Sequence, residues 1–210
     1  MDQVREKPWL AHYDPGVPPE IQVPDIPLWR FLEESARRFP QNVALEFLGK
    51  TLSYQELWGL ARRFAQGLKD LGVRPGDRVA IMLPNSPQFV IAFYGTLLAG
   101  GVGVNVNPLY TPRELRHQLA DAGAETLVIL DHLLPRYLEV EKEVPVKRVV
   151  VTGIKDFLPF PKNLLYPLKA KRDGLPLGFP KREGFHAFAE LLKRPPAEPH
   201  VPDPEDLALL

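Results

Sequence analysis

The sequence contains no cysteine. Disulfides, thiolate nucleophiles and cysteine-based metal sites are therefore excluded. It also lacks an excess of either charge, because 26 lysines and arginines balance 26 aspartates and glutamates. A chain without net positive charge has no general electrostatic attraction for nucleic acid, so we expect no nucleic-acid partner.

Proline, by contrast, is abundant. The chain has 24 prolines in 210 residues, whereas average usage is about 5%. Many prolines together with no cysteine fit a cytoplasmic, heat-adapted protein. The 45% hydrophobic and 25% charged residues are typical of a folded domain.

The sequence offers no strong candidate for a targeting or membrane-spanning segment. Residues Met1–Gly16 carry charges of both signs and no apolar core, unlike a signal peptide. Residues 79–112 carry no charge at all, but prolines, glycines and asparagines interrupt them. The longest helix there, about 87–99, would be roughly 20 Å long, too short for a hydrocarbon core of about 30 Å. We expect this segment to be buried within a protein core.

Short apolar segments alternate with helical patterns through the middle of the chain. We expect strands at 79–83, 102–106, 126–130 and 149–151, with helices at 87–99, 112–122 and 132–142 between them. Before them we expect a helix at 28–39, a hairpin at 43–52, and a helix that Ser53 and Glu56 cap and Gly72 ends. The alternation predicts an α/β fold, a parallel sheet with helices on both faces.

The chain divides into four parts by composition. Residues 1–27 are an extended, proline-punctuated arm that we expect to lie on another surface, and residues 28–152 are the α/β part. Residues 153–184 are a proline-rich basic and aromatic insert, and residues 185–210 begin with a helix near 185–192 and continue as a linker. The final apolar run, Leu207–Leu210, resembles a strand interrupted at its start, so we expect a truncated product.

The insert allows two interpretations. It carries seven lysines and arginines against three acids, among several aromatic residues and prolines. Residues 155–182 could dip into a membrane interface, which would make the protein membrane-peripheral. They could equally form a proline-stiffened flap on their own domain.

No catalytic or metal-ligating constellation is present in the sequence. It has no lysine-bearing phosphate loop, no G-x-S-x-G motif and no H-E-x-x-H pair, and its five histidines are scattered. Gly100, Gly101 and Gly103 precede a strand rather than a helix, so they predict a helix stop and not a dinucleotide site. We expect a backbone or a ligand to approach Gly103 closely.

Two helix starts at the carboxyl edge of the predicted sheet could bind anions. Thr111 and Glu114 form a capping-box pattern, and Glu114 already supplies the negative charge there. The start at Asn85–Gln88 has no acid and is the better anion candidate, although a plain helix cap explains it as well. Asp131 could cap the next helix or face a cleft.

Several motifs together resemble the AMP-forming adenylating enzymes, the superfamily of acyl-CoA synthetases, peptide-synthetase adenylation domains and firefly luciferase. Their order and spacing over residues 50–130 carry the resemblance. The last eight residues, 203–210, are similar to the run before the family's Thr/Ser/Gly-rich phosphate loop, and 155–167 resembles an insertion of bacterial long-chain fatty acyl-CoA synthetases. The motifs are Leu52–Leu57, Gly76–Ile81, Leu83–Pro87, Leu98–Gly101, Val104–Asn105, Asn107–Pro108, Tyr110–Leu115 and Asp121–Ala124.

The resemblance implies an N-terminal fragment of a long-chain fatty acid–CoA ligase, part of that enzyme's large domain. The full enzyme would use a fatty acid, ATP, Mg²⁺ and CoA, but the family's ATP, metal and catalytic-lysine residues lie beyond Leu210. We therefore expect no catalytic or metal residue here, no bound cofactor and no activity of this fragment alone.

The loop residues Asn107, Pro108 and Tyr110 lie where some relatives approach CoA. A homo-oligomer is a further expectation. The alternative is a stand-alone α/β module that binds a nucleotide or a partner at the Asn85 and Thr111 helix starts, without catalysis.

Overall fold

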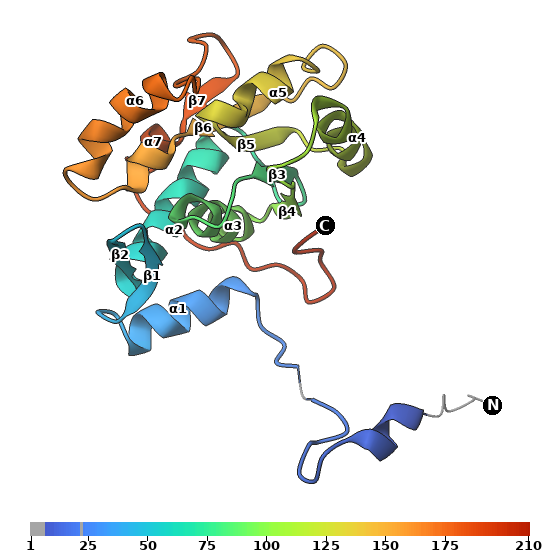
Figure 1. Cartoon of the computed structure of the whole chain (residues 1–210). Helices are drawn as coiled ribbons and strands as arrows, with labels where there is room; N and C mark the ends of the chain where they lie inside the picture. The colour runs from blue at the N-terminus through green and yellow to red at the C-terminus, as the bar shows by residue number, and fades with distance from the viewer. Residues whose placement is uncertain (1–6, 22) are drawn as a thin grey trace.

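The computed structural model describes residues 7–21 and 23–210. Its centre is a five-stranded sheet in the order β4-β3-β5-β6-β7, and all neighbouring strands are parallel (Figure 1). The strands are β3 (Arg78–Met82), β4 (Val102–Asn105), β5 (Thr126–Leu130), β6 (Arg148–Thr152) and β7 (Phe185–Ala187). The predicted α/β class with a parallel sheet is confirmed.

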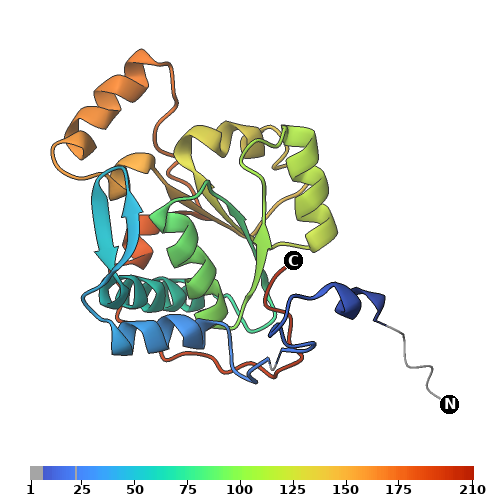
Figure 2. The same ribbon diagram turned by 60° about the horizontal axis from the view of Figure 1, so that its bottom comes forward.

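Helices cover both faces of this sheet, as Figure 2 shows. One layer holds α2, α3 and α7, with α1 outside it, while α4 and α5 lie on the other face. The bounds are α1 (Trp29–Arg38), α2 (Tyr54–Asp70), α3 (Pro87–Ala99), α4 (Pro112–Ala122), α5 (Leu134–Leu138), α6 (Lys162–Arg172) and α7 (Phe188–Leu191). Short 3-10 turns are η1 (Pro8–His12), η2 (Asp131–Leu133) and η3 (Ile154–Phe157).

The uncharged segment forms the centre of the core. In β3 the residues from Val79 to Met82 are fully buried, and β5 is buried along its whole length. Between β3 and β4 runs α3, which is apolar on nearly every side because the sheet and α2 enclose it. This two-sided burial explains the missing charges. No helix of residues 7–21 and 23–210 is both long enough and apolar enough to cross a membrane.

Local signals placed the first elements correctly. A hairpin of β1 (Val43–Phe47) and β2 (Lys50–Ser53) turns through Leu48 and Gly49, which both have positive φ angles. The side chain of Ser53 accepts a hydrogen bond from the Glu56 amide, and the Glu56 carboxylate accepts one from the Ser53 amide. The predicted capping box of α2 is thus confirmed.

Two predicted helices are wrong in part. The helix expected at 132–142 is only the turn η2 followed by the five-residue α5. The helix expected near 185–192 is divided into the edge strand β7 and the one-turn helix α7. Pairing with β6 fixes residues 185–187 as a strand, and that long-range contact leaves no periodic signal in three residues.

The end of the chain continues the sheet beyond β4. Gly103 forms a parallel bridge with Leu209, its amide donates to the Ala208 carbonyl at 3.0 Å, and the Leu210 amide donates to the Gly103 carbonyl at 2.8 Å. A Cβ at position 103 would stand 3.4 Å from Leu209 Cδ1. The segment that approaches Gly103 closely is therefore residues 208–210 of the chain itself, through backbone hydrogen bonds and the Leu209 side chain.

The described part of the arm, residues 7–21 and 23–27, extends away from the helical body (Figure 1). Lys7 and Glu20, near the two ends of residues 7–21, form an ion pair at 2.6 Å. Its end at residues 25–28 lies close to the chain's last residues, 201–208. The expectation for residues 1–6 and 22 of the arm lies outside the described residues.

Candidate functional site

The carboxyl ends of the strands form the edge at which open α/β sheets bind ligands, where the strand order reverses. Here the order reverses around β3, because β4 lies on one side of β3 and β5 on the other. The segments that leave this edge are 83–86 after β3, 106–111 after β4, and Asp131 after β5. Both predicted helix starts, at Ser86 and Thr111, lie on this edge.

The loop after β4 holds the three residues expected to face CoA. Asn107 accepts a hydrogen bond from the Leu109 amide on its Oδ1 at 2.9 Å, and its carbonyl accepts the Tyr110 amide at 3.0 Å. These bonds form a tight turn with Leu109 at its exposed tip. The side chain of Asn107 is exposed, whereas Pro108 and Tyr110 are half-buried.

A residue far along the chain fixes this turn. Arg136, in α5, donates from one guanidinium nitrogen to the Pro108 carbonyl at 2.5 Å and to the Tyr110 carbonyl at 3.0 Å. Charge-assisted bonds of this kind are stronger than bonds between neutral groups. Sequence analysis missed Arg136, because nothing local marks an arginine whose partners lie 26 and 28 residues away.

The helix start at Thr111 is occupied by its own acid. Glu114 accepts hydrogen bonds from both the amide and the hydroxyl of Thr111, at 2.8 and 2.7 Å. These bonds hold the pKa of the Glu114 carboxyl below its usual range. The carboxylate therefore takes the place that an external anion would need, as the sequence predicted.

The other helix start, at Ser86, is closed by a cap and a buried network. Ser86 Oγ accepts the Phe89 amide at 3.4 Å. The fully buried Gln88 donates from Nε2 to the Gly153 carbonyl at 3.0 Å, which ties α3 to the end of β6. Gln88 Oε1 has no hydrogen-bond partner among the described residues. Gln88 is a structural residue that the sequence analysis did not single out.

Asp131 is neither a simple cap nor a group that faces an open cleft. It is only 4% exposed, and its carboxylate accepts the His132 amide at 2.8 Å and the Gly178 amide at 3.4 Å. Gly178 belongs to the insert, so Asp131 links the sheet edge to that segment. Burial, Asp131 and Asp173 together raise the pKa of the nearby Tyr166.

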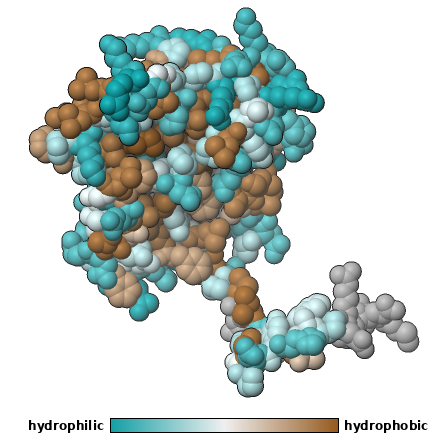
Figure 3. Space-filling model, in the orientation of Figure 1, coloured by the Kyte–Doolittle hydropathy of each residue, from teal (hydrophilic) through white to brown (hydrophobic). Residues whose placement is uncertain are grey.

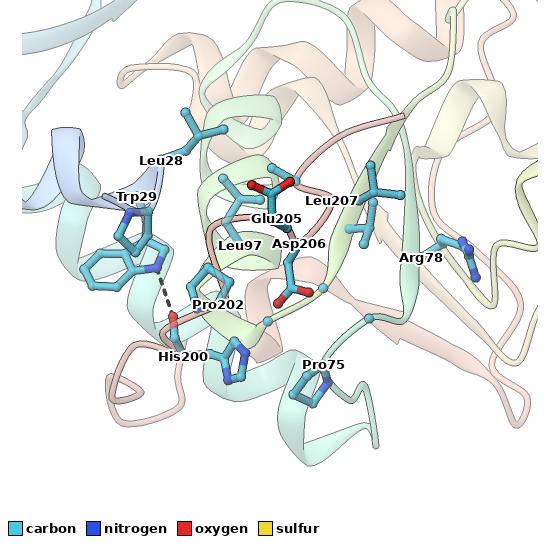
Figure 4. Close-up of a pocket in the computed structure, with 16 residues that line it drawn as sticks. Leu28, Trp29, Pro75, Arg78, Leu97, His200, Pro202, Glu205, Asp206 and Leu207 are labelled. Carbon is cyan, nitrogen blue, oxygen red and sulfur yellow. Dashed lines mark hydrogen bonds between the residues drawn. The ribbon is translucent and has the colours of Figure 1, made fainter. Parts of the chain in front are cut away.

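A partly open hollow of about 490 Å³ lies at the opposite edge of the sheet. Arg78 and Val102, at the starts of β3 and β4, line it together with the chain's last residues, and Figure 4 shows Glu205 and Asp206 in this hollow. Trp29 donates from Nε1 to the His200 carbonyl at 3.0 Å across one side of it. This position, at the amino ends of the strands, is not the edge where such folds hold nucleotides.

The structure also places the predicted helix stop at Gly100 and one of the scattered histidines, His117. Gly100 ends α3 with a φ of 89°, so the predicted helix stop is confirmed. His117 is exposed on α4. Within residues 7–21 and 23–210 no three His, Asp or Glu side chains gather as a metal site would require.

Comparison with known proteins identifies the family. The model of the family described as "AMP-binding enzyme" matches residues 32–210. The chain is 41% identical over 209 residues to the long-chain-fatty-acid–CoA ligase of Bacillus subtilis (strain 168), covering 98% of this chain and 37% of that protein. It is 40% identical over 163 residues to the ligase of the same name from Escherichia coli O157:H7, covering 76% of this chain and 29% of that protein. The chain thus spans well under half the length of these relatives.

Solved structures agree on the fold. A long-chain-fatty-acid-CoA ligase (FadD1) from Archaeoglobus fulgidus superposes with a TM-score of 0.70 at 23% identity, covering 91% of this chain and 35% of that one. The apo structure of MbtA from Mycobacterium smegmatis gives 0.70 at 30% identity, covering 89% and 31%. The predicted resemblance is confirmed: the chain belongs to the AMP-binding enzyme family.

Proposed function

We propose that the full protein to which this chain belongs is a long-chain fatty acid–CoA ligase. The observation that carries the proposal is the 41% identity to the Bacillus subtilis ligase across nearly the whole chain. In the first half-reaction a fatty-acid carboxylate oxygen attacks the α-phosphorus of ATP, and pyrophosphate leaves. In the second, the sulfur of CoA attacks the acyl carbon, and AMP leaves with the electron pair of the broken C–O bond.

This chain supplies scaffold for that reaction and no catalytic residue. Pyrophosphate departure needs a lysine-bearing loop and Mg²⁺ to stabilise the developing charge, and the sequence has no such loop. ATP, Mg²⁺ and CoA are therefore cofactors and substrates of the full enzyme in this proposal. The chain alone binds none of them and is inactive.

The part of the site that we assign to this chain is the CoA side of the loop after β4. Asn107, Pro108 and Tyr110 lie at the carboxyl edge of the sheet, and Arg136 holds their backbone. A rigid, exposed turn at this edge suits a surface along which a long thiol substrate passes. Arg136 is a positioning residue in this assignment, since its hydrogen bonds go to backbone carbonyls of the loop.

We further propose a cytoplasmic, heat-adapted homo-oligomer with peripheral membrane contact through residues 155–182. The proline content supports heat adaptation. Exposed apolar side chains on the arm, such as Ile21 and Val23, support self-association. The exposed leucines of α6, Leu164, Leu165 and Leu168, support membrane contact.

The test of the ligase proposal is ATP–pyrophosphate exchange. We expect the full-length protein to exchange labelled pyrophosphate into ATP when palmitate and Mg²⁺ are present, and not with acetate in place of palmitate. We expect no exchange by the 210-residue chain. Exchange by the 210-residue chain would contradict its assignment as scaffold, and tight ATP binding without exchange by either protein would favour the stand-alone module.

A further inference from the structure

The helix α6 presents its apolar side chains outward. Leu164, Leu165 and Leu168 are 65%, 57% and 69% exposed, and Phe160 just before the helix is 78% exposed. Leu168 lies on the same face as Leu165 and Leu164, which are three and four residues before it, because residues three and four apart share a side of a helix. A surface helix ordinarily turns such a face toward the core.

The opposite side of α6 holds the helix in this orientation. The residues turned toward the body are Asn163, Tyr166, Pro167 and Ala170, of which Ala170 is 1% exposed. Lys162 Nζ donates to the Leu48 carbonyl of the β1–β2 turn at 2.9 Å. Figures 1 and 2 both show α6 at the outside of the molecule. The leucine face is therefore fixed outward by packing on the other side.

Positive charge lies at the C-terminal end of this face. Lys169, Lys171 and Arg172 follow the leucines on the last turn of α6, and the helix contains no acidic residue. The two acids of residues 155–182 offset only part of this charge. Asp173 forms an ion pair with Arg172 at 3.4 Å, whereas Asp156 accepts bonds from Thr152 Oγ1 and the Gly153 amide, both at 2.9 Å. Among the described residues, Lys169 and Lys171 form no ion pair.

The apolar surface continues past the helix. Leu175 and Leu177 are partly exposed and line a shallow hollow with Pro167 and Leu168. Figure 3 shows hydrophobic surface interleaved with hydrophilic surface on the side of the molecule where α6 lies. We name Phe160, Leu164, Leu165, Leu168, Lys169, Lys171 and Arg172 the α6 face.

We propose that the α6 face docks on a lipid bilayer that contains anionic phospholipid. The leucines and Phe160 would enter the boundary between headgroups and acyl chains, while Lys169 and Lys171 contact lipid phosphates, as in interfacial amphipathic helices. The inference rests on the proposed function, because a long-chain fatty acid partitions into bilayers and this face would keep the enzyme at its substrate. Charge complementarity selects lipid over a second copy of this chain, whose α6 face carries the same positive charge.

Vesicle co-sedimentation of the 210-residue chain tests the proposal. We expect binding to vesicles of phosphatidylcholine with 30% phosphatidylglycerol, and binding at least about tenfold weaker to pure phosphatidylcholine. Leu165→Gln with Leu168→Gln, and separately Lys169→Glu with Lys171→Glu, should each lower the partition coefficient on the anionic vesicles at least about tenfold. These side chains are exposed, so far-ultraviolet circular dichroism should remain that of the unmodified chain.

Matched controls show whether vesicle binding depends on the α6 face or on exposed apolar and charged residues in general. Val201→Thr changes an exposed apolar residue elsewhere, and Lys142→Glu reverses an exposed charge outside the insert. Both should bind vesicles as the unmodified chain does. Equal binding to the two vesicle types, or unchanged binding by the leucine and lysine variants, would overturn the proposal.

Two further outcomes are decisive. If the leucine variant turns a dimer into a monomer and no protein binds vesicles, the face is an interface between copies and the lipid assignment is wrong. The same substitutions in the full-length protein should leave ATP–pyrophosphate exchange unchanged when palmitate is supplied on cyclodextrin. Vesicle binding is measured without any turnover, so failure of the ligase proposal and failure of lipid docking are separate results.

Discussion

Gly67 of α2 lies directly against Leu191 of α7. A Cβ at position 67 would stand 2.5 Å from Leu191 Cβ and 2.9 Å from Leu191 Cα. Beside this contact the rings of Phe64 and Phe188 lie 4.6 Å apart between centroids. The missing side chain at Gly67 thus allows the chain to return from the insert and pack α7 against the helical layer of the sheet.

Gly67→Ala should destabilise the fold, although alanine favours helix over glycine by about 1 kcal/mol. The added carbon meets the backbone of α7 as well as a side chain, so α7 must shift. We expect a net loss of about 1–3 kcal/mol in the free energy of unfolding, measured by urea denaturation. The control is Gly59→Ala in the same helix, where a Cβ meets nothing within 4 Å. It should raise stability by about 0.5–1 kcal/mol, and a stabilising Gly67→Ala would contradict the close contact.

The fold was predictable where the signal is local. The capping box at Ser53 and Glu56, and the proline that starts α3 at Pro87, fixed helix starts to within a residue. By contrast, β7 at Phe185–Ala187 was not predictable, because three residues give no period. Its strand conformation depends on pairing with β6, in which each partner lies 36 residues earlier, as in the pair Val150 and His186. Long-range pairing of this kind is decided by tertiary packing.

The candidate site was predictable to a similar extent. The loop Asn107–Tyr110 could be placed at the carboxyl edge from the strand order that the alternation implies. Its support by Arg136 could not, because hydrogen bonds to backbone carbonyls follow from the folded geometry. Gln88 likewise reads as one polar residue in an apolar helix until its bond to Gly153 is seen.

Thr111→Val should weaken α4 and change the titration of Glu114. The substitution removes the hydroxyl that caps the helix, at a cost of about 1 kcal/mol in the free energy of unfolding. The pKa of Glu114 is lowered in the folded state by its bonds to Thr111, so its stabilising effect is present above the usual carboxylate pKa. That effect is lost as the pH falls through the lowered value.

Carbon-detected NMR titration measures this prediction. In the variant the pKa of Glu114 should rise toward its usual range, although the amide of residue 111 still donates. Thr51→Val, an exposed change on β2, should leave the Glu114 titration as it is. An unchanged pKa in Thr111→Val would show that the hydroxyl contributes nothing.

The proposed CoA role of the loop after β4 predicts that Arg136→Gln impairs use of CoA by the full-length protein and spares adenylation. Without the guanidinium the Asn107–Tyr110 turn loses two bonds to its carbonyls, and we expect the KM for CoA to rise about five- to tenfold. ATP–pyrophosphate exchange needs no CoA, so its rate should not change. Arg113→Gln, on the exposed side of α4, is the matched control. Parallel losses in both half-reactions would count against a specific role of this loop.

Heat adaptation predicts a thermal unfolding midpoint of the chain above about 65 °C, the upper end of the range of mesophilic domains. Prolines contribute by lowering the entropy of the unfolded chain. Pro145→Ala, in the exposed loop before β6, should lower the free energy of unfolding by about 0.4–1 kcal/mol. Scanning calorimetry measures both quantities. A midpoint near 50 °C would contradict the heat adaptation inferred from the proline content.

Self-association through the arm predicts that the chain loses its oligomeric state when residues 1–27 are deleted. Ile21 and Val23 are 80% and 78% exposed, and Trp9 is more than half exposed. When a second copy covers side chains of this kind, apolar surface leaves water, and this stabilises the association of the two copies. Light scattering coupled to size-exclusion chromatography should give a multiple of 23.7 kDa for the whole chain and a monomer mass after deletion. Ile21→Ser with Val23→Ser should also shift the mass toward the monomer, because it removes apolar area and keeps the arm, whereas Val201→Thr should not. A monomer at every concentration of the whole chain would exclude the arm as a contact between copies.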